Sequence, residues 1–282
     1  EEWRNLYCDL KVNAEKYSTC IEKKSNKKVT KVVENNMNME FITGSEIKEN
    51  EIRICMEKTC GNKVMCFEYD GMIWKESRVS FDYNKDYELV DNCKMMFGLN
   101  KIGMKRIESN FRIEKINKKE STWTNNWHKV MMKENEKVVY CLMKKIGNGE
   151  NISQYKNKKK LLLEKEVATE IAKIAMFRGI FRVTDFNMRN ILLDNDNTLV
   201  SIDEGDIGKR KSIFGAREKW LKTYLNNEIM QDAYNDIIMK KEEKKSKIEI
   251  MMKKYDYNKD MINKVLLYFD NLENDLKKEG FM

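Results

Sequence analysis

A short hairpin pattern in the second half of the chain constrains the fold more than any other feature. Ile191 to Leu193 is an apolar run, and Thr198 to Ile202 is a second run of β-branched and apolar residues. Between them, Asp194 to Asn197 supplies side chains that favour turns. Two such runs around a turn predict an antiparallel β-hairpin, which brings the chain back to its starting point.

Polar side chains flank this predicted hairpin on both sides. Asn190 comes directly before the first strand, Asp203 comes directly after the second, and Asp185 lies five residues before Asn190. We expect the hairpin to bring Asp203 back beside Asn190, with Asp185 on the loop that leads to it. Carboxylate and amide oxygens that converge in this way can hold Mg²⁺, a hard cation that also takes phosphate oxygens as ligands.

The order Asp-x-x-x-x-Asn, strand, turn, strand, Asp-x-Gly resembles the catalytic centre of the protein-kinase-like superfamily. The resemblance implies that Asp185 is the catalytic Asp, which orients the attacking hydroxyl, and that Asn190 and Asp203 bind metal. It also implies that Arg189, four residues after Asp185, lies near the transferred phosphate. The resemblance is sharp over residues 177–208 and architectural elsewhere.

The motif departs from that of the regulated eukaryotic protein kinases. Val183 and Thr184 stand where His-Arg usually precedes the catalytic Asp, and Glu204 replaces the Phe of Asp-Phe-Gly. The chain has no proline, so an Ala-Pro-Glu motif is also missing. Similar changes occur in phosphoinositide-kinase-like and other atypical kinases, so the chain resembles an atypical member of the superfamily.

Residues 41–80 predict a β-meander that ends in a strand with a central lysine. Alternating or apolar runs at 51–57, 64–69 and 72–79 predict three strands, and Asp70-Gly71 is a strong hairpin signal. By resemblance, Lys75 on the third strand binds the α- and β-phosphates. By the same resemblance, Gly61 in the turn between the first two strands contacts phosphate, although one glycine cannot make the full Gly-x-Gly-x-x-Gly loop.

The stretch from 82 to 99 predicts a helix, which the resemblance makes the regulatory helix of an N-lobe. Glu88 is the best candidate for the acid partner of Lys75, and Asp91 is the next. An exposed acid on a helix surface remains an equal alternative for Glu88.

Two more strands are expected at 107–116 and 137–143, and a long apolar-faced helix is expected at 161–180. By resemblance, residues 142–146 form the hinge that meets adenine, with Leu142 and Met143 at the base. The chain after Asp203 is helical in character.

These elements predict an α+β fold of the bilobal protein-kinase-like type, with a small antiparallel β N-lobe and a mainly helical C-lobe. We expect residues 1–40 to form an N-terminal extension, residues 41–146 the N-lobe and residues 147–282 the C-lobe.

The expected function is ATP- and Mg²⁺-dependent transfer of a phosphoryl group to a hydroxyl of a protein or lipid acceptor. One alternative is a pseudokinase, a binding or scaffolding module that keeps the fold without catalysis. Another is a basic nucleic-acid-binding protein, which the net charge of +8 suggests. Lysine and glutamate are interspersed, however, so no concentrated basic stripe supports the nucleic-acid reading.

The amino-acid composition indicates the cellular compartment of the protein and the kind of genome that encodes it. The seven cysteines include no Cys-x-x-Cys, and the chain has one histidine, which argues against a zinc cluster and favours reduced thiols in the cytoplasm. No run of about 18 apolar residues, the length of a membrane span, occurs. The absence of proline and the scarcity of histidine and glutamine indicate an AT-rich genome, such as that of a virus or an intracellular parasite, in which case the location is the host cytoplasm.

Overall fold

The computed structural model describes residues 40–54, 66–76, 83–115, 130–147, 151–183, 186–194, 196, 198–214, 218 and 220–282. At residues 53, 54, 83, 84, 115 and 130 it describes the backbone alone. The described residues all belong to one compact unit, Asn38–Met282. The predicted N-terminal extension, Gly61 and Asp185 lie outside the described residues, apart from Glu40.

A six-stranded sheet occupies the first half of the described chain, in the order β1-β5-β6-β4-β3-β2. Its strands are β1 (Glu40–Ile42), β2 (Arg53–Ile54), β3 (Cys66–Tyr69), β4 (Met72–Glu76), β5 (Lys105–Lys115) and β6 (Val130–Lys144). All neighbours are antiparallel except β1, which runs parallel to β5. The α+β class is confirmed, but the sheet is mixed, because the unpredicted edge strand β1 joins β5 in the parallel sense.

A second, two-stranded sheet and most of the helices follow. The hairpin consists of β7 (Ile191–Leu193) and β8 (Leu199–Ser201), which pair antiparallel as predicted. The helices are α4 (Tyr83–Lys94), α5 (Lys158–Leu163), α6 (Lys165–Phe181), α7 (Leu221–Tyr224), α8 (Asn227–Ile238), α9 (Lys241–Lys254), α10 (Lys259–Asp270) and α11 (Leu272–Lys278). Short 3₁₀ turns are η1 (Gly44–Glu46), η2 (Glu49–Glu51), η3 (Met95–Phe97) and η4 (Met188–Asn190). No helix within the described ranges is both long and apolar enough to cross a membrane.

Local sequence accounts for several element boundaries. Asp70 and Gly71 join β3 to β4 with φ angles of 49° and 68°, the left-handed pair that a tight hairpin turn requires. The side chains of Asn226 and Asn258 begin α8 and α10 by accepting hydrogen bonds from the backbone N–H of Ile229 and Met261.

Some predicted boundaries were wrong. The strand expected to start at Glu51 begins at Arg53, because Glu51 closes the 3₁₀ turn η2. The helix expected at 161–180 is divided, since extended backbone at Glu164 separates α5 from α6. The first residues of the expected hinge, Leu142 to Lys144, continue strand β6.

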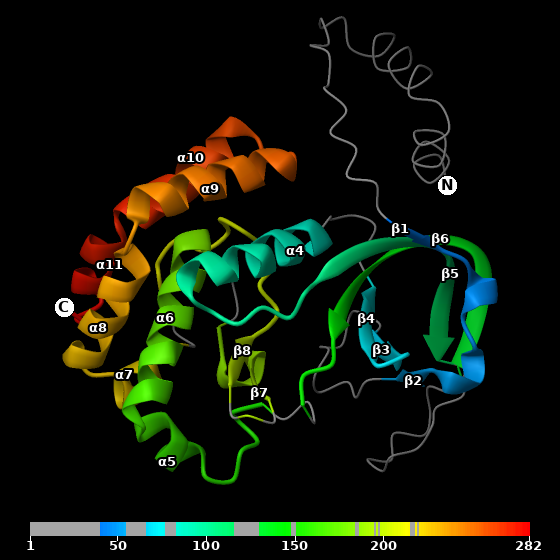
Figure 1. Cartoon of the computed structure of the whole chain (residues 1–282), viewed down its shortest axis with the longest axis horizontal. Helices are drawn as coiled ribbons and strands as arrows, with labels where there is room; N and C mark the ends of the chain where they lie inside the picture. The colour runs from blue at the N-terminus through cyan, green and yellow to red at the C-terminus, as the bar shows by residue number, and fades with distance from the viewer. Residues whose placement is uncertain are drawn as a thin grey trace, which may run out of the picture. The chain divides into compact units, whose positions relative to one another are not determined.

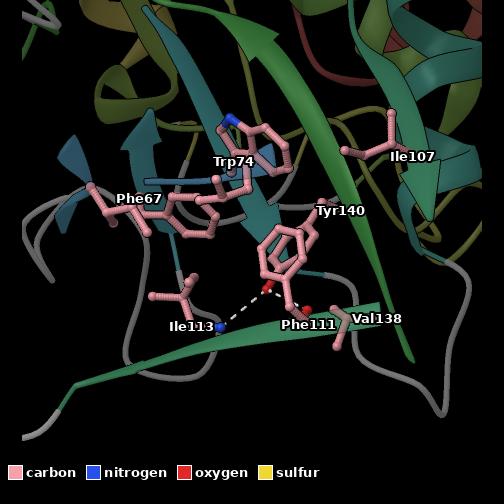
Figure 2. Packing of buried hydrophobic residues seen from close by; sticks show 9 residues of the cluster. Phe67, Trp74, Ile107, Phe111, Ile113, Val138 and Tyr140 are labelled. Carbon is pink, nitrogen blue, oxygen red and sulfur yellow. Dashed lines mark hydrogen bonds between the residues drawn. The ribbon is translucent and has the colours of Figure 1, made fainter. Parts of the chain in front are cut away.

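An aromatic core covers one face of the six-stranded sheet. Trp74 lies next to Phe67, Tyr140 and Phe111, with ring centroids 5.5, 5.6 and 6.3 Å away. Figure 2 shows these rings together with Ile107, Ile113 and Val138. The buried Tyr140 hydroxyl also accepts a hydrogen bond from Ile113 N–H at 3.3 Å, so the polar group of this side chain has a partner within the core.

Helix α4 covers the opposite face of the sheet, and α6 organises the helices that follow. α4 contacts β5 and β6 on one side and α9 on the other (Figure 1). α6 contacts α5, α8, α10, α11 and strand β8. The chain from Ile171 to Phe181 within α6 is almost entirely buried, so neighbouring elements enclose this part of the helix on nearly all sides.

We predict that Phe111→Ala lowers the free energy of unfolding by about 3–5 kcal/mol, the usual cost of removing a buried phenyl ring. Phe111 is fully buried and stacks on Tyr140 at 5.7 Å. Phe41→Ala is the matched control, because Phe41 lies on the adjoining strand β1 but is 52% exposed. Urea unfolding of both variants checks this, and equal losses would show that the aromatic cluster is not the stabilising core.

Candidate functional site

Lys75 belongs to a row of side chains that crosses the α4-facing side of the sheet. The strand register places Cys66, Lys75, Cys141 and Arg106 opposite one another on β3, β4, β6 and β5, and directly opposed side chains share a face. Lys75 extends from this row to Asp203, whose Oδ1 lies 2.5 Å from the Lys75 Nζ. The side chains are 15% and 37% exposed, so the ion pair is only partly shielded from solvent.

The hairpin sets the position of Asp203. Ile191 pairs with Ser201, and the backbone N–H of Ile202 donates to the carbonyl of Asn190 at 2.8 Å. Asp203 therefore follows immediately after the residue that is hydrogen bonded to Asn190, as the sequence predicted. Its φ of 62° lies in the left-handed region, which is uncommon for any residue with a side chain and is often found at functional sites.

Tyr87 of α4 is the third member of this group. Its hydroxyl donates to Asp203 Oδ1 at 2.9 Å and accepts from the Lys75 Nζ at 3.1 Å. The Lys75 Nζ also lies 4.3 Å from the centre of the Tyr87 ring, within the range of a cation–π contact. Gly205 makes room for the ring, because a Cβ there would lie 2.9 Å from the Tyr87 Cζ.

The charges of this group follow from its surroundings. Burial alone would lower the pKa of Lys75, but the nearby Asp203 carboxylate raises the pKa well above its ordinary value. Burial would raise the pKa of Asp203, yet the attraction of Lys75 and hydrogen bonds from Lys75 and Tyr87 lower it. Burial raises the pKa of Tyr87. Near neutral pH the site therefore holds one ammonium, one carboxylate and one neutral phenol.

The expected acid partners of Lys75 make other contacts. Glu88 accepts from Arg106 Nε at 2.8 Å, so the prediction that it pairs with Lys75 was wrong. The physical reason is the rotation of α4: successive helical residues point about 100° apart, and Tyr87 rather than Glu88 faces Lys75. Arg106, further along the same row of the sheet, then meets Glu88.

Asp91, the second candidate, serves the loop after α4. Its carboxylate accepts from the backbone N–H groups of Ile102, Gly103 and Met104 at 2.9, 2.8 and 2.9 Å. It also pairs with Lys94 at 3.1 Å. These contacts hold the turn between α4 and β5, and they leave Asp91 fully buried and away from Lys75.

A buried ionic network lies directly behind Asp203. Lys94 Nζ is 2.6 Å from the Glu204 carboxylate, and Arg178 Nη1 is 3.6 Å from its other oxygen. With Asp91, the network contains two acids and two bases, none of them more than 1% exposed. Balanced charges of this kind keep the cost of burying each ion down.

The network also holds the backbone around Asp203. Arg178 donates to the carbonyls of Ile202 at 3.0 Å and Asp203 at 3.3 Å, and to the Ser201 hydroxyl at 3.2 Å. Lys94 donates to the Ser201 carbonyl at 2.6 Å. Helices α4 and α6 thereby fix the segment that carries Asp203 from two sides.

The remaining predicted residues are distributed around this group. Asn190 is buried at the end of η4, directly before β7, while Arg189 is exposed on the same turn. Leu142 and Met143 lie in β6. Asp185 lies outside the described residues, so its distance to Asn190 and Asp203 stays a prediction.

A small apolar cluster lies between the sheet and the hairpin, next to Lys75. Its buried members are Ile102, Met104, Cys141 and Val200, and Tyr87, Met143, Ile146 and Ile202 pack against it. Cys141 is directly opposite Lys75 across the strands, and Ile202 directly precedes Asp203. The cluster therefore forms an apolar surface next to both Lys75 and Asp203.

The residues near Asp203 provide some, but not all, of the oxygen ligands that a hard cation such as Mg²⁺ needs. Among the described residues, no three His, Cys, Asp or Glu side chains gather closely enough to hold a metal ion. The oxygen donors on either side of the hairpin are the Asp203 carboxylate and the side-chain amide oxygen of Asn190. Mg²⁺ commonly accepts such ligands when phosphate oxygens and water complete its shell.

Sequence reasoning missed Tyr87, Lys94 and Arg178. Arg178 did carry a signal, because a lone arginine within the apolar helix α6 must find buried partners. Tyr87 carried none beyond its place one residue before Glu88. Lys94 is one of many lysines, and nothing in its neighbours separates it from a surface residue.

Comparison with family models found no match, and a search of curated proteins also found none.

We predict that Glu204→Gln lowers the free energy of unfolding by about 3 kcal/mol, because removing one charge leaves Arg178 and Lys94 with an unbalanced buried positive charge. Glu243→Gln is the control: it breaks an exposed pair with Lys247 and should change stability little. Urea unfolding measures both, and a small loss in Glu204→Gln would mean that the network does not hold the fold.

We predict that the stability difference between wild type and Asp203→Asn depends on pH. Since the folded-state pKa of Asp203 is below its ordinary value of 3.8, its stabilisation is fully present above that value. It is lost as the pH falls through the folded-state pKa, so the difference should shrink in acid. Asparagine tolerates the left-handed backbone here.

Urea unfolding across this pH range measures the difference. The Lys75→Met background is the control, because the depression of the pKa depends on Lys75. If the pH dependence is the same in both backgrounds, Lys75 does not lower the pKa of Asp203.

Proposed function

We propose that this protein is an ATP- and Mg²⁺-dependent phosphotransferase that acts on a hydroxyl of a protein or lipid acceptor. The observation that carries the proposal is the ion pair between Lys75 and Asp203, which are 128 residues apart in sequence. The sequence resemblance assigned phosphate binding to the lysine and metal binding to the aspartate, and these two side chains are in direct contact.

In this proposal each residue has a distinct task. Lys75 binds the α- and β-phosphates, and Asp203 and Asn190 hold the metal. Bound Mg²⁺ would neutralise phosphate charge during transfer. Asp185, five residues before Asn190, orients the acceptor hydroxyl, and Arg189 lies on the exposed turn η4 where an incoming phosphate could meet it.

The apolar cluster beside Lys75 supports a place for the nucleotide base. Met143 and Ile146 are half-buried and pack against this cluster. Strand β6 ends there at Lys144, and the chain continues as a loop. We assign Met143 to the neighbourhood of adenine on this basis. The same observation gives no support to Leu142, which pairs with Trp74 and packs against the aromatic core on the other face of the sheet.

The arrangement of the elements fits this proposal at the level of the two halves of the fold. The six-stranded sheet with α4 corresponds to an N-lobe, and the hairpin with α5 to α11 corresponds to a helical C-lobe (Figure 1). Lys75 comes from the first half and Asp203 from the second, as a nucleotide site between two lobes requires.

A second candidate function is a nucleotide-binding module without transferase activity. One observation favours it: the acids of α4 that were expected to pair with Lys75 are engaged by Arg106, Lys94 and backbone groups. A phosphate-binding lysine without a separate acid partner is less firmly positioned for catalysis. Binding of ATP without transfer to any acceptor would support this second function.

We predict that ATP with Mg²⁺ raises the melting temperature of the wild-type protein, because a ligand that binds the folded state stabilises it. Lys75→Met should weaken this shift while leaving the fold intact. Lys133→Met is the matched control, since Lys133 is also a strand lysine with an acid partner, Glu114, but its side chain is 40% exposed. No shift at millimolar nucleotide would exclude both proposed functions.

Transfer to acceptors separates the two functions. Asp185→Asn should reduce transfer at least about a hundredfold with nucleotide affinity nearly unchanged, because that residue acts on the acceptor. Asp203→Asn should weaken nucleotide binding in the presence of Mg²⁺ as well. Wild-type transfer rates in both variants would show that the site is assigned wrongly.

A further inference from the structure

Lys75 has one acid partner in the part of the chain that the structure describes. That partner is Asp203, at 2.5 Å. The other contact of its ammonium is the neutral Tyr87 hydroxyl at 3.1 Å. Glu88 is held by Arg106 and Asp91 by Lys94 and three backbone N–H groups, so neither is available to replace Asp203.

Tyr87, the neutral contact of Lys75, is held in place by its surroundings. The Tyr87 hydroxyl contacts both Lys75 and Asp203, and the glycine at position 205 leaves room for the Tyr87 ring. The buried network behind Asp203 is already balanced within itself, since Lys94 and Arg178 face Glu204 and Asp91. Among the residues that the structure describes, Lys75 and Asp203 therefore neutralise each other and share no further acid.

We infer that Lys75 and a divalent cation compete for the Asp203 carboxylate, so that the cation binds tightly only when a triphosphate takes over Lys75. The inference rests on the proposed function and adds a rule for the order of events at that site: metal and nucleotide bind together, and metal alone binds poorly.

The competition follows from charge and distance. Lys75 and Tyr87 both contact Oδ1, and a cation on either carboxylate oxygen lies within a few ångströms of the Lys75 ammonium. Two positive groups at that distance repel each other strongly in a partly buried site. A triphosphate removes the conflict, because its anionic oxygens give Lys75 a new partner while they also complete the shell of the metal.

The test is binding of Mn²⁺ alone to the full-length protein, measured from the electron paramagnetic resonance signal of free Mn²⁺ without nucleotide. Lys75→Met should bind Mn²⁺ about tenfold or more tightly than wild type, within the usual range of a coupling between two sites. Lys75→Gln should show the same gain, since it removes the charge but keeps a hydrogen-bonding group. It also provides a second variant if Lys75→Met folds poorly.

Two controls locate the effect. Lys133→Met, which removes a lysine from another ion pair on the sheet, should leave Mn²⁺ binding unchanged. The double variant Lys75→Met with Asp203→Asn should lose the gain. If wild type binds Mn²⁺ as tightly as Lys75→Met and Lys75→Gln do, or if the gain survives Asp203→Asn, the competition does not exist.

Failure of the proposed function gives a different result. In that case ATP with Mg²⁺ does not stabilise the wild-type protein, whereas the comparison of Mn²⁺ affinities uses no nucleotide. A gain of Mn²⁺ binding in Lys75→Met would then still support competition at Asp203, and absence of a gain in a protein that binds ATP would overturn this inference alone.

Discussion

The buried ion network formed by Asp91, Lys94, Arg178 and Glu204 holds the described part of the molecule together at its centre. It joins α4, α6 and the segment after β8, which come from three separate parts of the sequence. Desolvated charges are costly unless each has a partner with good geometry, so the network tolerates little displacement of any of these elements. The backbone that carries Asp203 is placed by this requirement.

α4 receives additional restraints along its length. Asp86 accepts from the backbone N–H of Ile207 at 3.0 Å, and Asn92 donates to the Tyr255 hydroxyl at 2.9 Å. Together with the ion pair between Glu88 and Arg106, these contacts tie the helix to the sheet, to the loop after Asp203 and to the C-terminal helices. A helix held from three directions moves only if several polar contacts break together.

Sequence reasoning located elements better than it located contacts. Alternating or apolar runs predicted β3, β4, β5 and the second half of β6, and turn chemistry predicted the hairpin, because these signals are local. The sequence suggested Glu88 as the acid partner of Lys75, whereas the partner in the structure is Asp203. The prediction failed because the rotation of α4 about its axis, which turns Tyr87 rather than Glu88 toward the lysine, cannot be deduced from the sequence. The buried network was missed because Lys94 and Glu204 resemble surface residues in sequence, and their burial follows from packing between distant segments.

The contact between Gly205 and Tyr87 has a consequence for the variation that this site permits. The two positions share one small volume, so a larger side chain at position 205 needs a smaller one at position 87. The residues are far apart in sequence and belong to different halves of the fold, yet they should change as a pair. Such paired exchange offers a way to identify distant relatives whose sequences no longer resemble this one.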